Sequence, residues 1–280
     1  MNTNVTKATL LALAFLLLSC NKVDNFLEID TPRFSGNFAT ESTSTPDEIK
    51  LVSFNIEFGI KLEEALEELQ TSENLRDADI ILLQEMDEIG TETIAQTLEY
   101  NYVYYPSNRN INGSLFGLAI LSKWPILEDE KLLLPHATPV NERKRIAMTA
   151  EIMLGDQPLR IYNIHASTLT VPKANRREQF EIPLAHLSAL ETDTTIQNVI
   201  VAGDFNTDKD ADINYLVGLH LEEGFLWASE EVGPTFQIFS GFASFRLDHA
   251  FTRGFDIIEA GKNEETRASD HVPIWLKLRF

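Results

Sequence analysis

Eight residues along the chain carry side chains that can bind a metal ion or move a proton, and most of them come directly after an apolar run. Residues 80–83 (IILL), for example, are followed by Gln84 and Glu85, and residues 159–164 (LRIYNI) are followed by His165. If such runs are β-strands, their ends meet at one edge of a sheet and their polar groups share one cleft. The eight candidates are Asn55, Glu85, His165, Asp204, Asn206, Asp248, Asp270 and His271.

The chemistry that suits this set is a metal-assisted reaction on a phosphate. Carboxylates, amides and imidazoles at one sheet edge would repel each other and titrate abnormally unless a cation lay among them. Oxygen ligands select a hard cation, Mg²⁺ or alternatively Mn²⁺, and such ions suit phosphate chemistry. Each residue alone has a simpler explanation: Asn55 can cap a turn, Glu85 can face solvent, and His165 can be an ordinary hydrogen-bonded residue. Their order along the chain favours a shared site.

The segments that position these residues alternate between strand and helix patterns. Helices are expected at residues 61–70, 91–99, 174–190 and 212–219, with Pro183 interrupting or kinking the third. Hairpins mixed with strands that are separated by helices predict an α/β protein, in which two mixed sheets pack face to face with helices outside. Strands are expected at residues 50–56, 79–84, 118–122, 146–154, 159–164, 198–202, 246–252 and 274–278.

The N-terminus has the pattern of an exported lipoprotein. Lys7 precedes an apolar run from Leu10 to Leu18, which is too short to cross a bilayer and suits a signal peptide. The run ends in Leu17-Leu18-Ser19-Cys20, which resembles the bacterial lipobox, so Cys20 is the expected lipidation site; the alternative is a free cysteine at the edge of a discarded signal. Three regions follow: residues 1–19 as signal peptide, 20–48 as lipidated N-terminus and flexible tether, and 49–280 as the catalytic domain. The expected location is the cell envelope, at the outer membrane.

The net charge of the chain limits the classes of partner that it can bind. Acidic residues outnumber basic ones 43 to 23, and the formal charge is −20. Such a chain is a poor prospect for a long non-specific grip on nucleic acid, although a local phosphate contact is compatible with it. Cys20 is the single cysteine, so an internal disulfide is impossible. The expected partners are a phosphate-ester substrate and the bilayer; no protein partner is inferred, and a monomer is expected.

Each candidate residue lies within a short motif, and the motifs in chain order are SFNIE, LLQEMDE, YNIHAS, VAGDFNTD, RLDHAF and SDHVPIWL. Together they resemble the endonuclease/exonuclease/phosphatase superfamily, which includes exonuclease III-like nucleases, pancreatic-type deoxyribonucleases, bacterial sphingomyelinases and inositol polyphosphate 5-phosphatases. The resemblance covers residues 51–280 and implies a four-layer α/β sandwich that hydrolyses a phosphoester with a divalent metal.

The resemblance also implies roles for the candidate residues. Glu85 would be the main metal ligand, with Asn55 and Asp270 beside it, and Glu57 is a further candidate for the metal shell. Asp204 would orient or deprotonate the attacking water, while Asn206 would hold a phosphate oxygen. His271, oriented by Asp248, would contact the phosphate or pass protons, and His165 would stabilise charge or protonate the leaving group. The choice of base and acid among Asp204, His165 and His271 is open.

Two basic clusters stand out against the acidic background: residues 143–145 (Arg-Lys-Arg), and Lys173 with Arg176 and Arg177. The hypothesis is that Arg145 or Arg176 contacts a substrate phosphate; the alternative is a solvated loop and helix face. No convincing match exists for the catalytic tyrosine of the repair nucleases, for which Tyr104 and Tyr105 are unplaced candidates.

Two functions from different classes follow. The first is a membrane-anchored, Mg²⁺-dependent hydrolase of a phosphodiester or phosphomonoester, acting on a small phosphoester, a lipid head group or nucleic acid. The alternative is a surface binding lipoprotein that keeps the same fold without chemistry.

Overall fold

The computed structural model describes residues 22–40, 44–192, 195–207, 209–238 and 243–280. The predicted signal peptide and Cys20 therefore lie outside the described residues. Among the residues that are described, no helix is both long and apolar enough to cross a membrane.

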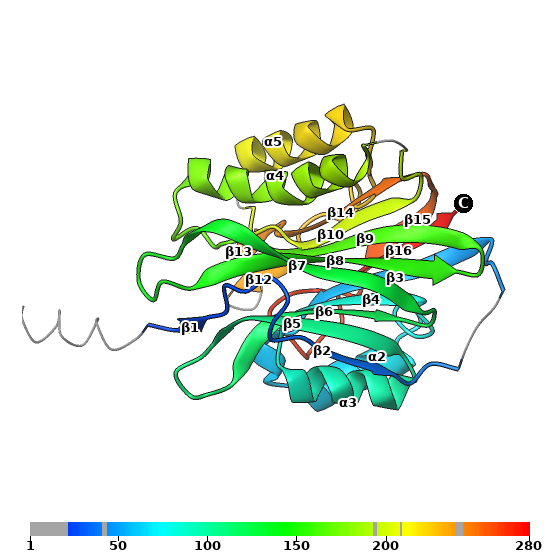
Figure 1. Ribbon diagram of the computed structural model, residues 1–280, viewed down its shortest axis with the longest axis horizontal. Coiled ribbons are helices and arrows are strands. Elements are labelled where there is room, and N and C mark those ends of the chain that lie inside the picture. Colours follow the sequence, from blue (N-terminus) through cyan, green and yellow to red (C-terminus); the bar gives the residue numbers. More distant parts are fainter. Residues whose placement is uncertain (1–21, 41–43, 193–194, 208, 239–242) are drawn as a thin grey trace, which may run out of the picture.

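Two mixed β-sheets form the centre of the molecule (Figure 1). Sheet A has eight strands in the order β1-β5-β6-β4-β3-β16-β15, with β2 also paired to β5. Sheet B has six strands in the order β11-β14-β10-β9-β8-β7, and β12 and β13 form a separate hairpin. The strands of sheet A are β1 Asp24–Asn25, β2 Phe34–Asn37, β3 Glu48–Asn55, β4 Ile80–Met86, β5 Asn101–Arg109, β6 Leu115–Ser122, β15 Asp256–Lys262 and β16 Ile274–Arg279. The remaining strands are β7 Ile126–Ala137, β8 Lys144–Leu154, β9 Gln157–His165, β10 Val199–Asp204, β11 Leu226–Trp227, β12 Phe236–Ile238, β13 Ala243–Phe245 and β14 Asp248–Arg253.

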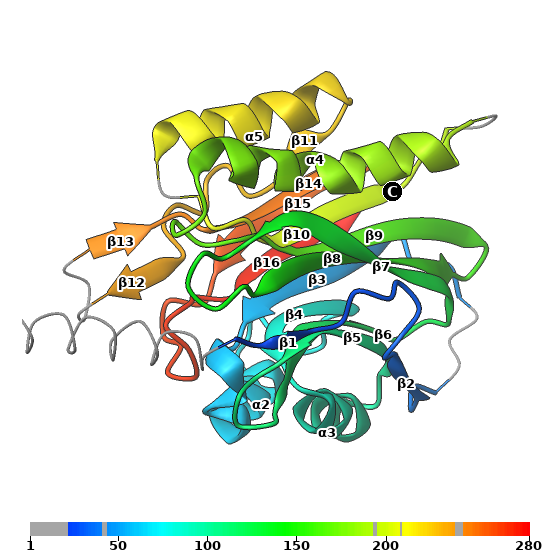
Figure 2. The ribbon, with the colours of Figure 1, turned by 60° about the vertical axis from the view of Figure 1, so that its left-hand side comes forward.

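Helices cover the outer face of each sheet, and four layers result (Figures 1 and 2). On sheet A lie α2 Leu62–Thr71 and α3 Glu88–Leu98, and on sheet B lie α4 Lys173–Leu190 and α5 Asp210–Glu222. A short 3-10 helix, η1 Glu57–Gly59, follows β3. The predicted four-layer α/β sandwich is confirmed. The expected interruption at Pro183 is not seen, because α4 runs through this residue as one helix.

Alternation along each strand divides the core into three parts. In β3, Leu51 packs in the cluster between the two sheets, whereas Val52 and Phe54 face the helices α2 and α3. A third cluster lies between sheet B and its helices and includes Phe180 of α4. The parallel pairs β3–β4 and β9–β10 all end on the same side of the molecule, so the polar residues that follow them can meet.

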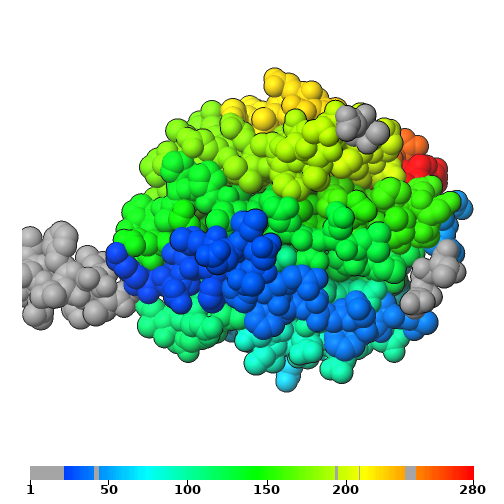
Figure 3. Space-filling view, viewed as in Figure 1, coloured from blue at the N-terminus to red at the C-terminus, as the bar shows by residue number. Residues whose placement is uncertain are grey.

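The prediction of a flexible tether is wrong for residues 22–40, which we call the N-terminal strap. Both strap strands, β1 and β2, pair with β5, and the strap lies across the face of the molecule shown in Figure 3. Phe34 packs against the apolar cluster of sheet A. Arg33 forms a two-pronged ion pair with Asp129 of β7, at 2.6 and 2.7 Å, and the ammonium of Lys131 donates to the Thr31 carbonyl at 2.8 Å. The sequence did not predict these contacts, because the segment is rich in polar residues and has no clear strand pattern.

Candidate active site

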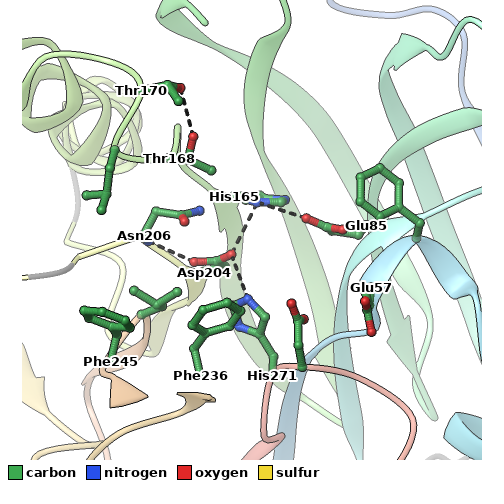
Figure 4. A pocket seen from close by; sticks show the side chains of 14 residues that line it. Glu57, Glu85, His165, Thr168, Thr170, Asp204, Asn206, Phe236, Phe245 and His271 are labelled. Atoms are coloured by element: carbon green, nitrogen blue, oxygen red, sulfur yellow. Dashed lines mark hydrogen bonds and ion pairs between the residues drawn. The ribbon is translucent and has the colours of Figure 1, made fainter. Parts of the chain in front are cut away.

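A cleft of about 440 Å³ lies where β3, β4, β9 and β10 end (Figure 4). Six of the eight residues predicted from the sequence line the cleft: Glu85, His165, Asp204, Asn206, Asp270 and His271. Asn55 and Asp248 lie buried behind them and contact lining residues. The structure therefore brings together side chains that are separated by up to 216 positions in the sequence, as the distance from Asn55 to His271 shows.

Glu85 is aimed into the cleft by an irregularity of β4. The pairing of β4 with β6 shifts register between Gln84 and Met86, and Glu85 has a left-handed backbone, with φ of 62°. A bulge of this kind re-aims one side chain relative to its strand. Burial raises the pKa of the Glu85 carboxyl, and the charges of Arg145 and His271 oppose that rise.

Asp204 lies at the centre of the site. The preceding Gly203 has φ of 137°, and a Cβ there would meet the Ile164 carbonyl oxygen at 2.2 Å, so only glycine fits. The backbone N–H of Asn206 donates to Asp204 at 2.9 Å, and the Nδ2 of Asn55 donates at 3.0 Å. Burial raises the pKa of Asp204 to about 7, despite the opposing charge of His271. A carboxyl with such a pKa can accept a proton near neutral pH.

His271 is held as a cation by Asp248. Its Nδ1 donates to the Asp248 carboxylate at 2.9 Å, and Thr235 donates its hydroxyl to the same oxygen at 2.6 Å. The Nε2 of His271 lies 3.8 Å from Asp204. Burial alone would lower the pKa of His271, but the charges of Asp248 and Asp204 outweigh it and raise the pKa to about 10.

His165 is held in the opposite state by Arg145. The Arg145 guanidinium donates to the Nδ1 of His165 at 3.1 Å. Because a guanidinium cannot accept a proton, Nδ1 is the acceptor and Nε2 carries the hydrogen of the neutral ring. That Nε2 lies 3.3 Å from Asp204 and 3.7 Å from Glu85. Burial, followed by the charge of Arg145, lowers the pKa of His165 well below its ordinary value.

The donors for a metal ion lie on the Glu85 side of the cleft. Glu85, Asp270 and Glu57 all present carboxylates to it, and the charge of Asp270 contributes to the raised pKa of Glu85. Asn55 donates its amide N–H to Asp204, and its oxygen accepts the Glu57 backbone N–H at 3.2 Å. This oxygen-rich, mutually repelling set fits a hard divalent cation. Asp204, Asp248 and His271 form a second group whose ligand atoms lie within 4.8 Å of one another. These atoms already have partners, since His271 and Asp248 are hydrogen-bonded to each other and Asp204 accepts from Asn55 and Asn206.

The structure does not bring Arg176 into the cleft, so the hypothesis that it contacts substrate is wrong. Arg176 is 4% exposed and donates to Asp212 of α5 at 2.7 Å. Lys173 and Arg177 also pair with Asp212, at 3.6 and 3.2 Å. The second basic cluster therefore joins α4 to α5 through Asp212, and the side chain of Lys173 stays 46% exposed.

The two tyrosine candidates also lie away from the reacting groups. Tyr104 is buried and donates its hydroxyl to the Met86 carbonyl at 2.9 Å, and Tyr105 donates to Asp129 at 2.7 Å. Neither lines the cleft.

Sequence reasoning missed the apolar walls of the cleft. Phe236 and Phe245 come from the β12–β13 hairpin, and Figure 4 shows them across the cleft from Glu85. Phe236 also packs against the ring of His271, with centroids 4.9 Å apart. Thr168, Leu169 and Thr170 follow the motif that contains His165, and this proximity was the one available signal. The further apolar lining residues are Phe58 and Leu247.

Known structures share this fold. Humanized TDP2 of D. rerio superposes with a TM-score of 0.67 at 18% identity, over 84% of this chain and all of that chain. A Bacteroides thetaiotaomicron protein of the endonuclease/exonuclease/phosphatase family gives 0.65 at 18% identity, over 85% and 99% of the two chains. The mannosyl-6-phosphatase Bt3783 of the same species gives 0.65 at 18% identity, over 83% and 100%.

No curated protein sequence matches the chain significantly. The model of the Endonuclease/Exonuclease/phosphatase family, in contrast, matches residues 52–271, which include every residue of the cleft described above. With its four-layer fold and its paired histidines and carboxylates, this chain belongs to the endonuclease/exonuclease/phosphatase family.

Proposed function

We propose that the protein is an exported, membrane-anchored phosphoesterase that depends on a divalent metal and hydrolyses its substrate by in-line attack of water. The observation that carries this proposal is the meeting of Asp204, His165 and the His271–Asp248 pair in one cleft beside Glu85 and Asp270. Such a set can activate a water molecule and neutralise the charge that develops on phosphate oxygens. Export and anchoring through Cys20 are supported by the N-terminal sequence pattern.

Glu85 and Asp270, with Asn55, are the residues that would hold Mg²⁺. Bound there, the cation would withdraw charge from the phosphate and lower the pKa of a water ligand. Asn55 would contribute its Oδ1, which lies on the Glu57 side, while its Nδ2 donates to Asp204.

The protein groups divide the remaining work. Asp204, hydrogen-bonded by Asn206 and Asn55, is placed to accept the proton of the attacking water. His271 brings a positive charge that Asp248 maintains. His165 offers a neutral N–H donor at Nε2, so it stabilises charge on the phosphate and is not a source of an acidic proton.

The lining of the cleft favours a small or lipid-like phosphoester over a nucleic acid chain. Among the described residues that line it, none is a lysine or an arginine, and five are Phe or Leu. A polyanion would need several cations along its backbone. A single phosphate at the Asp204 end, flanked by an apolar group against Phe236 and Phe245, matches the lining better.

The test is hydrolysis of bis(p-nitrophenyl) phosphate by the full chain, with Mg²⁺ and with EDTA, beside a His271→Ala variant. We expect EDTA to abolish turnover and His271→Ala to lower kcat about a hundredfold or more. His136→Ala is the matched control, since His136 pairs with Glu178 outside the cleft, and it should keep full activity. Turnover that persists in EDTA, or an unchanged kcat in His271→Ala, would refute the mechanism.

The alternative, a binding lipoprotein without chemistry, predicts a different pattern. In that case Mg²⁺ would raise the melting temperature through Glu85 and Asp270, while neither diesters nor monoesters of nitrophenol would be cleaved. Anchoring is tested separately by cell fractionation. If Cys20 carries the anchor, Cys20→Ala should move the protein from the membrane fraction to the soluble fraction.

A further inference from the structure

Exposed apolar side chains gather at the mouth of the cleft. Phe58, Ile111, Val140 and Leu169, which we call the apolar rim, are 47%, 64%, 61% and 54% exposed. Phe58, Ile111 and Val140 line one shallow depression, and Phe58 and Leu169 also line the catalytic cleft. The rim is therefore continuous with the cleft through Phe58. Neighbouring exposed apolar side chains with polar residues around them, here Asn110, Asn112 and Asn141, are characteristic of an interaction site.

The backbone holds Phe58 in the rim at a cost. Glu57, Phe58 and Gly59 have φ values of 47°, 58° and 62°, three successive left-handed residues of which one alone is glycine. This conformation is unfavourable for a phenylalanine, and such strain collects at functional positions. The ring is supported from below by Phe116, with centroids 5.1 Å apart. The strained turn thus presents a large apolar side chain to solvent at the mouth of the cleft.

The described chain begins beside this rim. Val23 lines the same depression as Ile111 and Val140, and its N–H donates to the Asn141 carbonyl at 3.2 Å. The amide of Asn25 donates to the Glu142 carbonyl at 2.8 Å, so β1 is fixed to the turn that carries Val140. Figure 1 shows β1 at the same end of the molecule as the β5–β6 and β7–β8 turns. Covalent geometry limits the distance from Cys20 to Lys22 to about 7 Å.

We infer that the apolar rim docks on a lipid bilayer, so that the catalytic cleft opens toward the membrane surface and takes phosphoesters presented there. This inference rests on the proposed anchoring. A lipid at Cys20 would be separated from the start of the described fold by too few residues to form a flexible tether, and it would therefore hold the rim at the bilayer. The formal charge of −20 disfavours an anionic surface, so the lipid that fits is zwitterionic.

The test is partition of the full chain onto phosphatidylcholine vesicles, with Cys20→Ser in every sample so that acylation does not mask the rim. We expect the double variant Ile111→Asn/Val140→Asn to lower the partition coefficient about tenfold, because two exposed apolar side chains no longer enter the bilayer. The matched control is Leu127→Asn/Leu190→Asn. Leu127 and Leu190 are 53% and 43% exposed and share a separate depression outside the cleft. The control should bind as the parent does.

Equal partition of the two double variants onto the vesicles would overturn the inference. Stronger partition of the rim variant than of the parent would also overturn it, because it would mean that residues 10–18 of the chain cover the rim. Hydrolysis of the soluble nitrophenyl diester is measured on the same samples and should be unchanged, because neither Ile111 nor Val140 lines the cleft. Lost partition with retained hydrolysis therefore supports docking, whereas absent hydrolysis in the parent counts against the proposed function alone.

Discussion

The two histidines of the cleft differ in protonation because of their nearest neighbours: His271 is a cation and His165 is neutral. His271 donates to Asp248, and His165 accepts from Arg145. Both rings are buried, so burial alone would make both neutral. The carboxylate reverses that effect for His271, whereas the guanidinium reinforces it for His165. A division of labour that the motifs left open is thus decided by one contact at each ring.

Replacing Asp248 with Asn should lower the pKa of His271, because burial would then act with less opposition. The pKa of about 10 lies above the ordinary 6.5 of histidine, so His271 adds stability that is fully present below pH 6.5 and is lost as pH rises through 10. Between pH 6.5 and 10, the melting temperature of the variant should therefore fall less steeply than that of the parent. Its kcat should be about a hundredfold lower. NMR titration of the ring in metal-free protein measures the pKa directly. Asp256→Asn, on the exposed side of β15, is the control, and an unshifted His271 in Asp248→Asn would contradict the assignment.

Residue types and order were enough to predict that Glu85 and Asp204 share a cleft, because each lies at the end of an apolar strand. His271 lies before β16, and its sequence motif was the signal that identified it. Residue types and order were not enough for Arg176. Its partner Asp212 lies 36 positions away on another helix, and only the packing of α4 on α5 brings the two together.

At the scale of elements, a pair of buried amides joins the two sheets beneath the site. Gln84 of β4 donates to the side-chain oxygen of Asn163 of β9 at 2.8 Å. Asn163 in turn donates to the carbonyls of Leu83 and Ala119, each at 2.9 Å. Glu85 follows Gln84 directly, and His165 lies two residues after Asn163, so this bridge sets the position of sheet A's ligand relative to sheet B's histidine.

Asn163→Leu should lower the free energy of unfolding by roughly 3 kcal/mol, since it leaves the Gln84 amide and two carbonyls buried without this partner. Adding Gln84→Leu should cost less than the sum of the two single changes, because the pair acts as a unit. Urea denaturation measures the three variants, and kcat should fall with them. The exposed Gln197→Leu serves as control and should change stability by less than about 0.5 kcal/mol. Full additivity would show that the two amides do not act together.

Among the strands of nine residues or more, β8 and β9 were predictable, but β5 and β7 were not. Pro106 interrupts the pattern of β5, and it lies where the pairing with β6 shifts register between Pro106 and Asn108. Strand β7 contains the acidic run 128–130 and Pro135, so its period-two pattern is weak. Both strands are stabilised by their neighbours, and that information is absent from a local window of sequence.

At the scale of the whole molecule, the N-terminal strap completes an edge. Without β1 and β2, the nine residues of β5 would form an open edge of sheet A. Exposed edges pair with other chains. We expect removal of residues 1–40 to cause self-association in static light scattering, whereas removal of residues 1–21 should leave the scattering mass unchanged. A truncated chain that scatters as the control does would show that the edge is protected by other means.

The position of β16 determines when the site can form during synthesis of the chain. This strand lies between β3 and β15 in sheet A, and it follows directly after His271. Asn55 and His271 stand near opposite ends of the family domain, which spans residues 52–271. During synthesis the first of these residues leaves the ribosome long before the last, and the partners of β3 are incomplete in between. The candidate site therefore cannot assemble on a growing chain until His271 and β16 have been made.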